Sequence, residues 1–200
     1  MTLREYIDRL RGRTVAVIGI GVSNTPLLRL LLREGISVTA CDRSSREKLG
    51  ALAGELEAAG AKLQLGDGYL QNLSQDVIFR TPGLRPDVPE LEAARAKGST
   101  ITSEMEVFFE VCPCPIIAVT GSDGKTTTTT IIAQLLRAAG HTVHVGGNIG
   151  HPLLAEADTI RPTDWAVLEL SSFQLMTMTH SPHIAVVTNL APNHLDVHKS

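Results

Sequence analysis

The sequence predicts an α/β protein with a Rossmann-like N-terminal domain, followed by the first part of a P-loop-type parallel-sheet domain. Short apolar runs of strand length alternate with segments whose apolar residues recur at helical spacing. Two strand-to-helix junctions are rich in glycine, at residues 19–24 and 120–127. Because the connections are short, the alternation indicates mainly parallel sheets, whose ligands lie beyond the carboxyl ends of the strands.

Length and composition narrow the class of protein. Two hundred residues with 43% hydrophobic content suit one large or two small domains, and we expect domains at 1–111 and 112–200, with a linker at Cys112–Pro115. A net charge of -3 and 4% aromatic residues argue against nucleic acid as a partner. No apolar run reaches the roughly 18 residues of a membrane span, and the polar start is no signal peptide, so we expect no membrane association and a cytoplasmic location. Three cysteines predict neither a disulfide framework nor a zinc site.

The first glycine-rich junction follows an apolar strand, Thr14–Ile18, and precedes a helix from about Pro26 to Glu34. A strand at Ile36–Cys41 comes next, and Asp42 stands at its end, where a Rossmann fold holds a ribose. Asn24 replaces the third glycine of the dinucleotide fingerprint, which leaves both a phosphate and ribose site and a plain βαβ turn open. The rest of this domain is predicted as alternating elements: helix 46–59, strand 62–65, strand 76–79 before the turn Thr81-Pro82-Gly83, helix 91–97, strand 100–102, and a helix capped at Ser103 that reaches Val111.

The second junction has the pattern of a phosphate-binding loop. A buried strand at Ile116–Val119 precedes it, and an apolar-periodic helix follows to Ala139, with Ile131, Ile132, Leu135 and Leu136 on the periodic positions. Gly121 and Gly124 allow backbone N–H groups to turn inward, Lys125 can reach outer phosphates, and the Thr126 hydroxyl can ligate Mg²⁺. Valine occupies position 119, where the general pattern has its first glycine. We predict a nucleoside triphosphate site; the alternative is a glycine turn beside an exposed lysine.

Three later strands deliver polar residues to the same sheet edge. Strand 142–145 leads to Asn148, strand 165–170 carries Glu169, and strand 184–188 leads to Asn189 and the cluster His194-x-Asp196-x-His198. Glu169 suits the acid that completes Mg²⁺ coordination; the alternative is a carboxylate that caps the Ser171-Ser172 turn. We expect His194 to contact Mg²⁺ or substrate with Asp196 orienting it, and His198 to be solvated.

Four ordered motifs make the chain resemble a known family: Thr120–Thr127 (TGSDGKTT), Gly146–Gly150 (GGNIG), Leu168–Leu175 (LELSSFQL) and Asn189–Asp196 (NLAPNHLD). Together they resemble the Mur ligases, and the third motif is most similar to the branch that adds D-glutamate to UDP-N-acetylmuramoyl-L-alanine. Folylpolyglutamate synthetases have a similar phosphate loop but lack a preceding UDP-binding domain. Asp123 stands where these ligases usually have asparagine, which leaves its effect on ATP binding open.

The resemblance implies ATP-dependent amide ligation through an acyl phosphate, with ATP and Mg²⁺ as cofactors. It implies catalytic roles for Lys125, Glu169 and His194, and metal contacts from Thr126, Glu169 and His194. ATP would be bound by Thr120, Gly121, Ser122, Asp123, Gly124, Lys125, Thr126 and Thr127. The UDP-sugar would be bound by Gly19, Gly21, Val22, Ser23, Asp42, Arg43, Thr81, Pro82, Gly83 and Asn148.

Two other functions stay open at this point. One is a nicotinamide-dependent oxidoreductase, or a nucleotide-sensing module, built on the first domain; the other is a protein that holds a UDP-sugar without turnover. In the family, a carbamylated lysine and a C-terminal domain that supplies much of the amino-acid site come after the histidine motif. We therefore expect this 200-residue chain to be a fragment that is not catalytic by itself. The oligomeric state and the amino acid added are not predicted from these residues.

Overall fold

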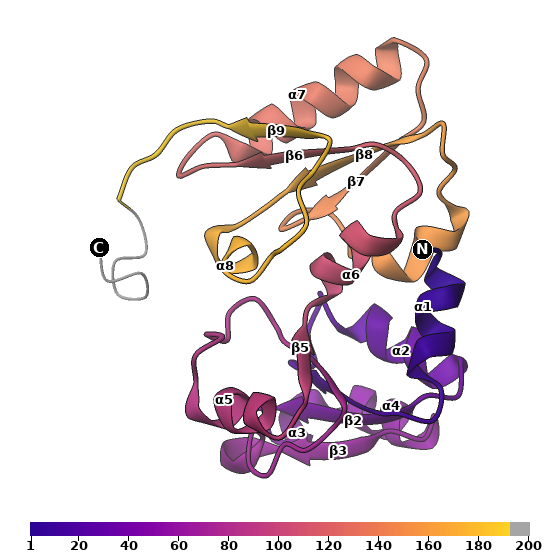
Figure 1. Ribbon diagram of the computed structural model, residues 1–200, viewed down its shortest axis with the longest axis vertical. Helices are drawn as coiled ribbons and strands as arrows, with labels where there is room; N and C mark the ends of the chain where they lie inside the picture. Colours follow the sequence, from indigo (N-terminus) through magenta and orange to yellow (C-terminus); the bar gives the residue numbers. More distant parts are fainter. Residues whose placement is uncertain (193–200) are drawn as a thin grey trace.

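The computed structural model describes residues 1–192, which form two parallel sheets. The first sheet has five strands in the order β3-β2-β1-β4-β5, and the second has four in the order β7-β8-β6-β9. Every paired strand in both sheets runs parallel to its neighbour. The first sheet fills the lower half of Figure 1 and the second the upper half. The predicted fold class is therefore observed.

The first sheet has β1 (Thr14–Ile18) at its centre, between β2 (Ser37–Asp42) and β4 (Val77–Phe79), with β3 (Lys62–Leu65) and β5 (Thr100–Thr102) at its edges. Its strands alternate their side chains between two apolar layers. Val15, Val17 and Phe79 belong to one buried cluster, and Ala16 and Ile18 belong to another on the opposite face. The central strand is therefore buried on both sides, as expected for a parallel sheet covered by helices.

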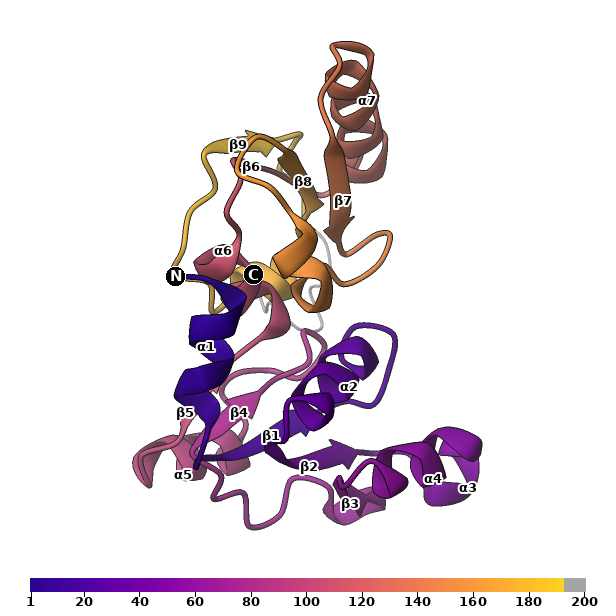
Figure 2. The ribbon, with the colours of Figure 1, turned by 90° about the vertical axis from the view of Figure 1, so that its right-hand side faces the viewer.

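Helices cover both faces of this sheet. The larger cluster contains residues of α1 (Leu3–Leu10), α2 (Thr25–Arg33) and α4 (Ala51–Ala58), whereas α5 (Pro89–Ala96) supplies Leu91 and Ala94 to the smaller one. The remaining short elements here are α3 (Arg46–Leu49) and a 3₁₀ turn η1 (Gly66–Gly68). Figure 2 shows α1 and α2 together on the side of this sheet that faces the second sheet.

The second sheet comprises β6 (Ile116–Thr120), β7 (Val143–Gly147), β8 (Trp165–Glu169) and β9 (Ile184–Val187). The long helix α7 (Lys125–Ala138) covers the face turned away from the first sheet (Figures 1 and 2). The other face packs on α6 (Glu104–Val111) and on the 3₁₀ segment η2 (Leu154–Thr159), while the short α8 (Ser172–Leu175) follows β8.

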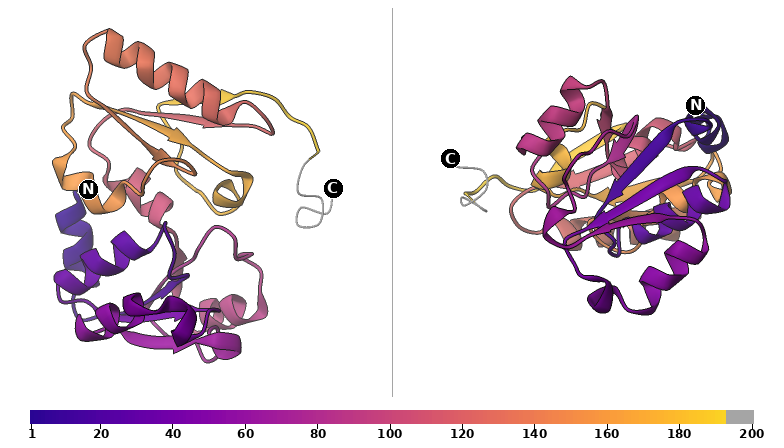
Figure 3. Two further views of the ribbon diagram at one scale, coloured as in Figure 1. Left: turned by 180° about the vertical axis from the view of Figure 1, so that it is seen from behind. Right: turned by 90° about the horizontal axis from the view of Figure 1, so that it is seen from below.

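The two sheets share one apolar core through α6 and η2. Met105 and Phe108 of α6 and Leu154 of η2 belong to the same cluster as Val17 in the first sheet and Leu168 in the second. The reverse view in Figure 3 shows both layers joined by the stretch that contains α6. Among residues 1–192, no helix is both long and apolar enough to span a membrane. The division into domains 1–111 and 112–200 stays a prediction.

Two predicted helices differ from the observed ones. The helix predicted at 46–59 is two short helices, because Gly50 adopts φ 56° and ψ -131°, values that end a helix. In α7, the residues buried against the sheet are Thr129 and Ala133, whereas Ile131 and Leu135 are exposed. The small side chains allow α7 to lie close to the strands. Of the bulky residues in the predicted apolar stripe, Ile132 and Leu136 are partly buried, and Ile131 and Leu135 lie away from the sheet.

Candidate functional site

The loop between β6 and α7 has the backbone shape that its glycines predict. Gly121 adopts φ 137° and Gly124 φ 77°, both in the region that favours glycine. A Cβ atom at Gly121 would lie 2.1 Å from the Thr188 hydroxyl, so only glycine fits between β6 and the end of β9. The loop is therefore built for close backbone approach, as in phosphate-binding loops.

The segment after β9 holds this loop in place. The Asp123 N–H donates to Oδ1 of Asn189 (2.9 Å), and the Ser122 hydroxyl donates to the Ala191 carbonyl (2.7 Å). The Thr188 hydroxyl donates to the Asp123 carbonyl (2.6 Å). Asn189, which the sequence placed at this sheet edge, thus lies against the loop, while His194, Asp196 and His198 lie outside the described residues.

Lys125 begins α7 and bends back over the loop. Its Nζ donates to the carbonyls of Gly121 (2.8 Å) and Ser122 (2.9 Å). Among residues 1–192 this ammonium group is held by neutral carbonyls alone, so it can exchange these partners for anionic oxygens, because hydrogen bonds between charged groups are stronger.

Three predicted residues meet beside the loop. In register, Glu169 at the end of β8 pairs with both Val119 of β6 and Gly147 of β7. Its Oε2 accepts from the Thr126 hydroxyl (2.6 Å), and its Oε1 accepts from Asn148 Nδ2 (2.9 Å). Glu169 therefore faces the loop. The Ser171 turn is instead closed by Gln174, whose Oε1 accepts from the Ser171 N–H (2.9 Å). This geometry favours the metal interpretation of Glu169 over the capping alternative.

This group of donors fits a hard cation. Mg²⁺ prefers oxygen ligands, and a buried carboxylate beside a hydroxyl at a phosphate loop supplies two of them. A cleft of about 500 Å³ opens beside the loop, between Lys125, Asn148 and α8. That volume lies within the range of small-molecule sites. The predicted phosphate loop, the donors of a candidate cation site and a ligand-sized cleft thus lie together.

The first glycine-rich loop, at 19–24, is ordered by Asp42. The Asp42 carboxylate accepts from the Ile20 N–H (2.6 Å) with Oδ2 and from the Ser44 N–H (2.6 Å) with Oδ1. Asn24 is buried and its Nδ2 donates to the Ile18 carbonyl (2.9 Å). The residue that replaces the third glycine therefore ties the loop to β1.

The loop also packs against the predicted turn Thr81–Gly83. Gly19 has φ 95°, and a Cβ atom there would lie 3.0 Å from Cβ of Thr81. The structure thus brings Gly19, Asp42 and Thr81 together at the carboxyl edge of the first sheet. Val22, Arg43 and Gly83 lie exposed at the same edge.

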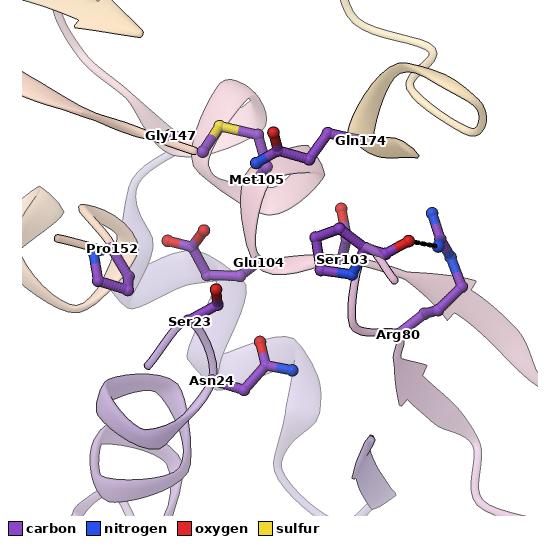
Figure 4. A pocket seen from close by; sticks show the side chains of 10 residues that line it. Ser23, Asn24, Arg80, Ser103, Glu104, Met105, Gly147, Pro152 and Gln174 are labelled. Atoms are coloured by element: carbon purple, nitrogen blue, oxygen red, sulfur yellow. Dashed lines mark hydrogen bonds between the residues drawn. The ribbon is translucent and has the colours of Figure 1, made fainter. Parts of the chain in front are cut away.

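The two candidate sites face each other across a small cavity of about 20 Å³ between the sheets. Figure 4 shows Ser23 and Asn24 on one side of it and Gln174 and Gly147 on the other. Ser23 belongs to the 19–24 loop, and Gly147 immediately precedes Asn148. A ligand that reached from the first loop to Asn148 would therefore have to pass this gap.

Two buried charged residues of the cavity wall are absent from the sequence prediction. Glu104 is 7% exposed, its Oε1 accepts from the Leu154 N–H (2.9 Å), and burial raises its pKa to about 7. Arg80 is 1% exposed, and burial lowers its pKa. The sequence feature that could have pointed to Arg80 is its position, as a charged residue directly after the apolar strand Val77–Phe79. Glu104 had no distinctive signal, because acids in a first helical turn are usually exposed.

Comparison with known proteins agrees with the family resemblance. Residues 119–200 match the Mur ligase middle domain. The chain is 54% identical over 199 residues to UDP-N-acetylmuramoylalanine–D-glutamate ligase of Acetivibrio thermocellus and 53% identical to that of Ruminiclostridium cellulolyticum. In both cases the match covers 99% of this chain and 43% of the relative, so the chain spans less than half the length of these relatives.

Solved structures support the fold. The UDP-N-acetylmuramate:L-alanyl-gamma-D-glutamyl-meso-diaminopimelate ligase of Neisseria meningitides matches with a TM-score of 0.52 and 21% identity, over 92% of this chain and 63% of that one. The UDP-N-acetylmuramate-alanine ligase of Thermotoga maritima matches with a TM-score of 0.52 and 22% identity, over 94% of this chain and 44% of that one. The predicted fold class is confirmed.

Proposed function

We propose that this chain is part of an ATP-dependent amide ligase of the Mur ligase family that adds D-glutamate to UDP-N-acetylmuramoyl-L-alanine, because residues 119–200 match the Mur ligase middle domain and its relatives are named for that ligation. The product is a peptidoglycan precursor, so the activity belongs to cell wall synthesis, and we propose a cytoplasmic location. One observation carries the proposal: Thr126, Asn148 and Glu169 converge beside a glycine loop whose lysine donates to two neutral carbonyls of that loop. The names of the relatives at 52–54% identity support the choice of D-glutamate.

The proposed reaction has two steps. A carboxylate oxygen of the alanyl group forms a bond to the γ-phosphorus of ATP as the bond from that phosphorus to the β,γ-bridging oxygen breaks, which leaves an acyl phosphate and ADP. The amine of D-glutamate then attacks the acyl carbon, loses a proton, and releases inorganic phosphate. Both steps depend on positioning and charge neutralisation more than on covalent help from the protein.

In this chain, the phosphate loop at 120–127 would bind the triphosphate through backbone N–H groups. We propose that Lys125 leaves the Gly121 and Ser122 carbonyls and binds the outer phosphates. Thr126 and Glu169 would hold Mg²⁺, which when bound offsets phosphate charge. The proposed metal role of His194 rests on the family resemblance, since that residue lies outside the described residues.

The first sheet would hold the nucleotide end of the UDP-sugar. We propose that the N–H groups of the 19–24 loop receive the diphosphate and that the Thr81–Gly83 turn and Arg43 flank the uridine. Asp42 has both carboxylate oxygens engaged by backbone N–H groups, so its main proposed role is to order the loop. Asn148, which donates to Glu169, would meet the sugar arm.

The decisive test of the phosphate loop is Lys125→Ala in the complete protein. We expect ATP turnover to be abolished and circular dichroism to be unchanged, because the substitution removes a charge from the triphosphate site without touching the core. Lys48→Ala, at an exposed lysine of α3, is the matched control. Near-normal turnover by Lys125→Ala would refute the assignment.

Calorimetry with UDP and with NADH separates this proposal from a nicotinamide-dependent oxidoreductase or sensor. We expect the chain to bind UDP more tightly, because Asn24 stands in place of the glycine that lets a dinucleotide-binding helix approach its strand. Tighter binding of NADH would favour the oxidoreductase.

We also propose that the 200-residue chain binds nucleotides without forming amide product, since it spans 43% of the length of its relatives. The assay supplies ATP, Mg²⁺, UDP-N-acetylmuramoyl-L-alanine and D-glutamate to this chain and, in parallel, to a full-length relative. Product formation at a comparable rate would overturn this part of the proposal. Nucleotide binding without turnover agrees with it.

A further inference from the structure

We propose that Arg80 is a positioning residue that couples the turn Thr81–Leu84 of the first sheet to the segment that follows Glu169 in the second. The inference rests on the proposed function, because it assigns these two segments to the two ends of one substrate site. When a ligand orders the turn at the uridine end, Arg80 would also order the segment at the phosphate end. A ligand at the phosphate end would likewise order the turn.

Arg80 holds the turn with one nitrogen of its guanidinium. Its Nη1 donates to the carbonyls of Thr81 (3.1 Å), Pro82 (3.0 Å) and Leu84. The turn is closed by the Leu84 N–H, which donates to the Thr81 carbonyl (3.1 Å). Because Thr81 packs directly against Gly19, the position of this turn also sets the position of the 19–24 loop.

The other nitrogen of Arg80 reaches the second sheet. Its Nη2 donates to the Phe173 carbonyl (3.3 Å) and to the Thr177 hydroxyl (3.0 Å). Phe173 lies in α8, which begins three residues after Glu169. Between them, the Leu170 carbonyl accepts from the Thr120 hydroxyl (2.9 Å), so the start of the phosphate loop joins the same hydrogen-bonded path.

The burial and bonding of Arg80 distinguish it from a surface arginine. Within the described residues it forms no ion pair, and its guanidinium donates to four backbone carbonyls and one hydroxyl. Burying a charged group costs free energy unless its donors and acceptors are hydrogen-bonded inside the protein. The planar fork of arginine satisfies both groups of acceptors at once, whereas the single ammonium of lysine cannot bridge them in the same way. Figure 4 shows Arg80 at the margin of the cavity between the sheets.

A double-mutant cycle on UDP binding by the chain tests this coupling. Thr177 lies in the segment that follows Glu169 in the second sheet. Thr177→Val removes one hydrogen-bond acceptor of Arg80 and keeps nearly the same side-chain volume. We expect it to weaken UDP binding about threefold to tenfold, and to have no further effect in an Arg80→Met background. Thr177→Ser, which keeps the hydroxyl, should bind UDP like the unmodified chain.

Thr179→Val is the matched control. Thr179 is also exposed and also bridges the two parts of the molecule, since its hydroxyl donates to Glu106 Oε1 of α6 (2.5 Å), but within the described residues no hydrogen bond joins it to Arg80 or to the turn. UDP binding unchanged by Thr179→Val and weakened by Thr177→Val supports the coupling. Equal effects of the two substitutions would overturn it, because general loosening between the sheets would then explain both.

Hydrogen exchange makes the result independent of the proposed ligand. We expect Thr177→Val to speed amide exchange in the peptide that contains Leu84, and Thr179→Val to leave it unchanged. If the unmodified chain binds no UDP, the proposed function fails while this measurement still decides the coupling. Unchanged exchange in Thr177→Val would overturn the role of Arg80 whether or not UDP binds.

Discussion

The two sheets of this protein differ in how well their outer parts are covered, although the central strands β1 and β8 are both buried along most of their length. In the first, the central strand β1 is enclosed, with Val15, Ala16, Val17 and Ile18 all fully buried. In the second, the edge strand β9 leaves Val187 56% exposed, and α7 leaves Leu135 65% exposed. The first sheet is covered by helices from its own part of the chain, whereas the second packs one face on α6 and η2 and leaves β9 unpaired on its outer side within the described residues.

The difference indicates where stability and where function reside. Regions with few buried apolar contacts open locally at lower free energy than a closed core does. The phosphate loop is held by the segment after β9, so the candidate ATP site depends on the less enclosed sheet. The 19–24 loop instead depends on the buried central strand β1 and on Asp42 at the end of its neighbour β2.

The largest expected effect comes from the enclosed sheet. Phe79→Ala should destabilise the chain by about 3–5 kcal/mol, because it opens a cavity beside a fully buried ring that also meets Tyr6 edge-on, with 6.5 Å between ring centroids. Val187→Ala, in exposed β9, should cost less than about 1 kcal/mol. Urea denaturation of the two variants measures both values, and similar losses would break the contrast between the sheets.

A second pair of substitutions compares the two glycine-rich loops. Gly121→Ala should cost about 2 kcal/mol or more and abolish ATP binding, because it adds strain at φ 137° and a clash with Thr188. Gly21→Ala meets no atom within 4 Å and should change stability by less than about 0.5 kcal/mol. Thermal denaturation and calorimetry with ATP measure these effects. A stable, ATP-binding Gly121→Ala variant would contradict the loop geometry.

The third prediction concerns Glu104, which lies where the two sheets meet. Burial raises its pKa from 4.5 to about 7, so the folded state binds the proton more tightly than the unfolded state does. The contribution of protonated Glu104 to the free energy of unfolding is therefore fully present below pH 4.5. It is lost as the pH rises towards 7, and the loss is at most about 3 kcal/mol. Glu104→Gln should remove this loss and be the more stable form at pH 8, while Leu154 keeps an acceptor.

Denaturation of the parent chain and of Glu104→Gln at pH 5 and pH 8 gives the comparison. Glu106→Gln is a control on the same helix, since that side chain instead accepts from Thr179 at the exposed rim. If the parent chain had a larger free energy of unfolding than Glu104→Gln at pH 8, the sign would be opposite to the one expected and the burial argument would be refuted.

The smallest effect is expected on the outer face of α7. Leu135→Gln should change the free energy of unfolding by no more than about 0.5 kcal/mol, because the side chain is already in water. Ala133→Gln, two residues earlier on the buried face, should be severely destabilising by overpacking. If Leu135→Gln destabilised the chain as strongly, α7 would have to pack differently from the structure described.

Local sequence signals were sufficient for most of the regular structure. Buried strands such as Thr14–Ile18 and Ile116–Thr120 are continuous apolar runs, and glycines mark the junctions that follow them, so their positions need no tertiary information. Helix α1 was not predicted, because polar residues separate its apolar ones. Its sequence does contain the signals of a helix, since Thr2 and Glu5 form a capping box and Leu3, Ile7 and Leu10 share one face.

The phosphate loop and Glu169 were predicted from the sequence because parallel strands end at a common edge, which makes neighbours of residues far apart in the chain. Only the tertiary structure decided what Arg80, Glu104 and Asn24 do. Each is a polar residue whose burial depends on a partner from another element, and no local pattern specifies that partner. The packing of one sheet on the other determines whether such a side chain lies in water or inside the protein, and therefore its role.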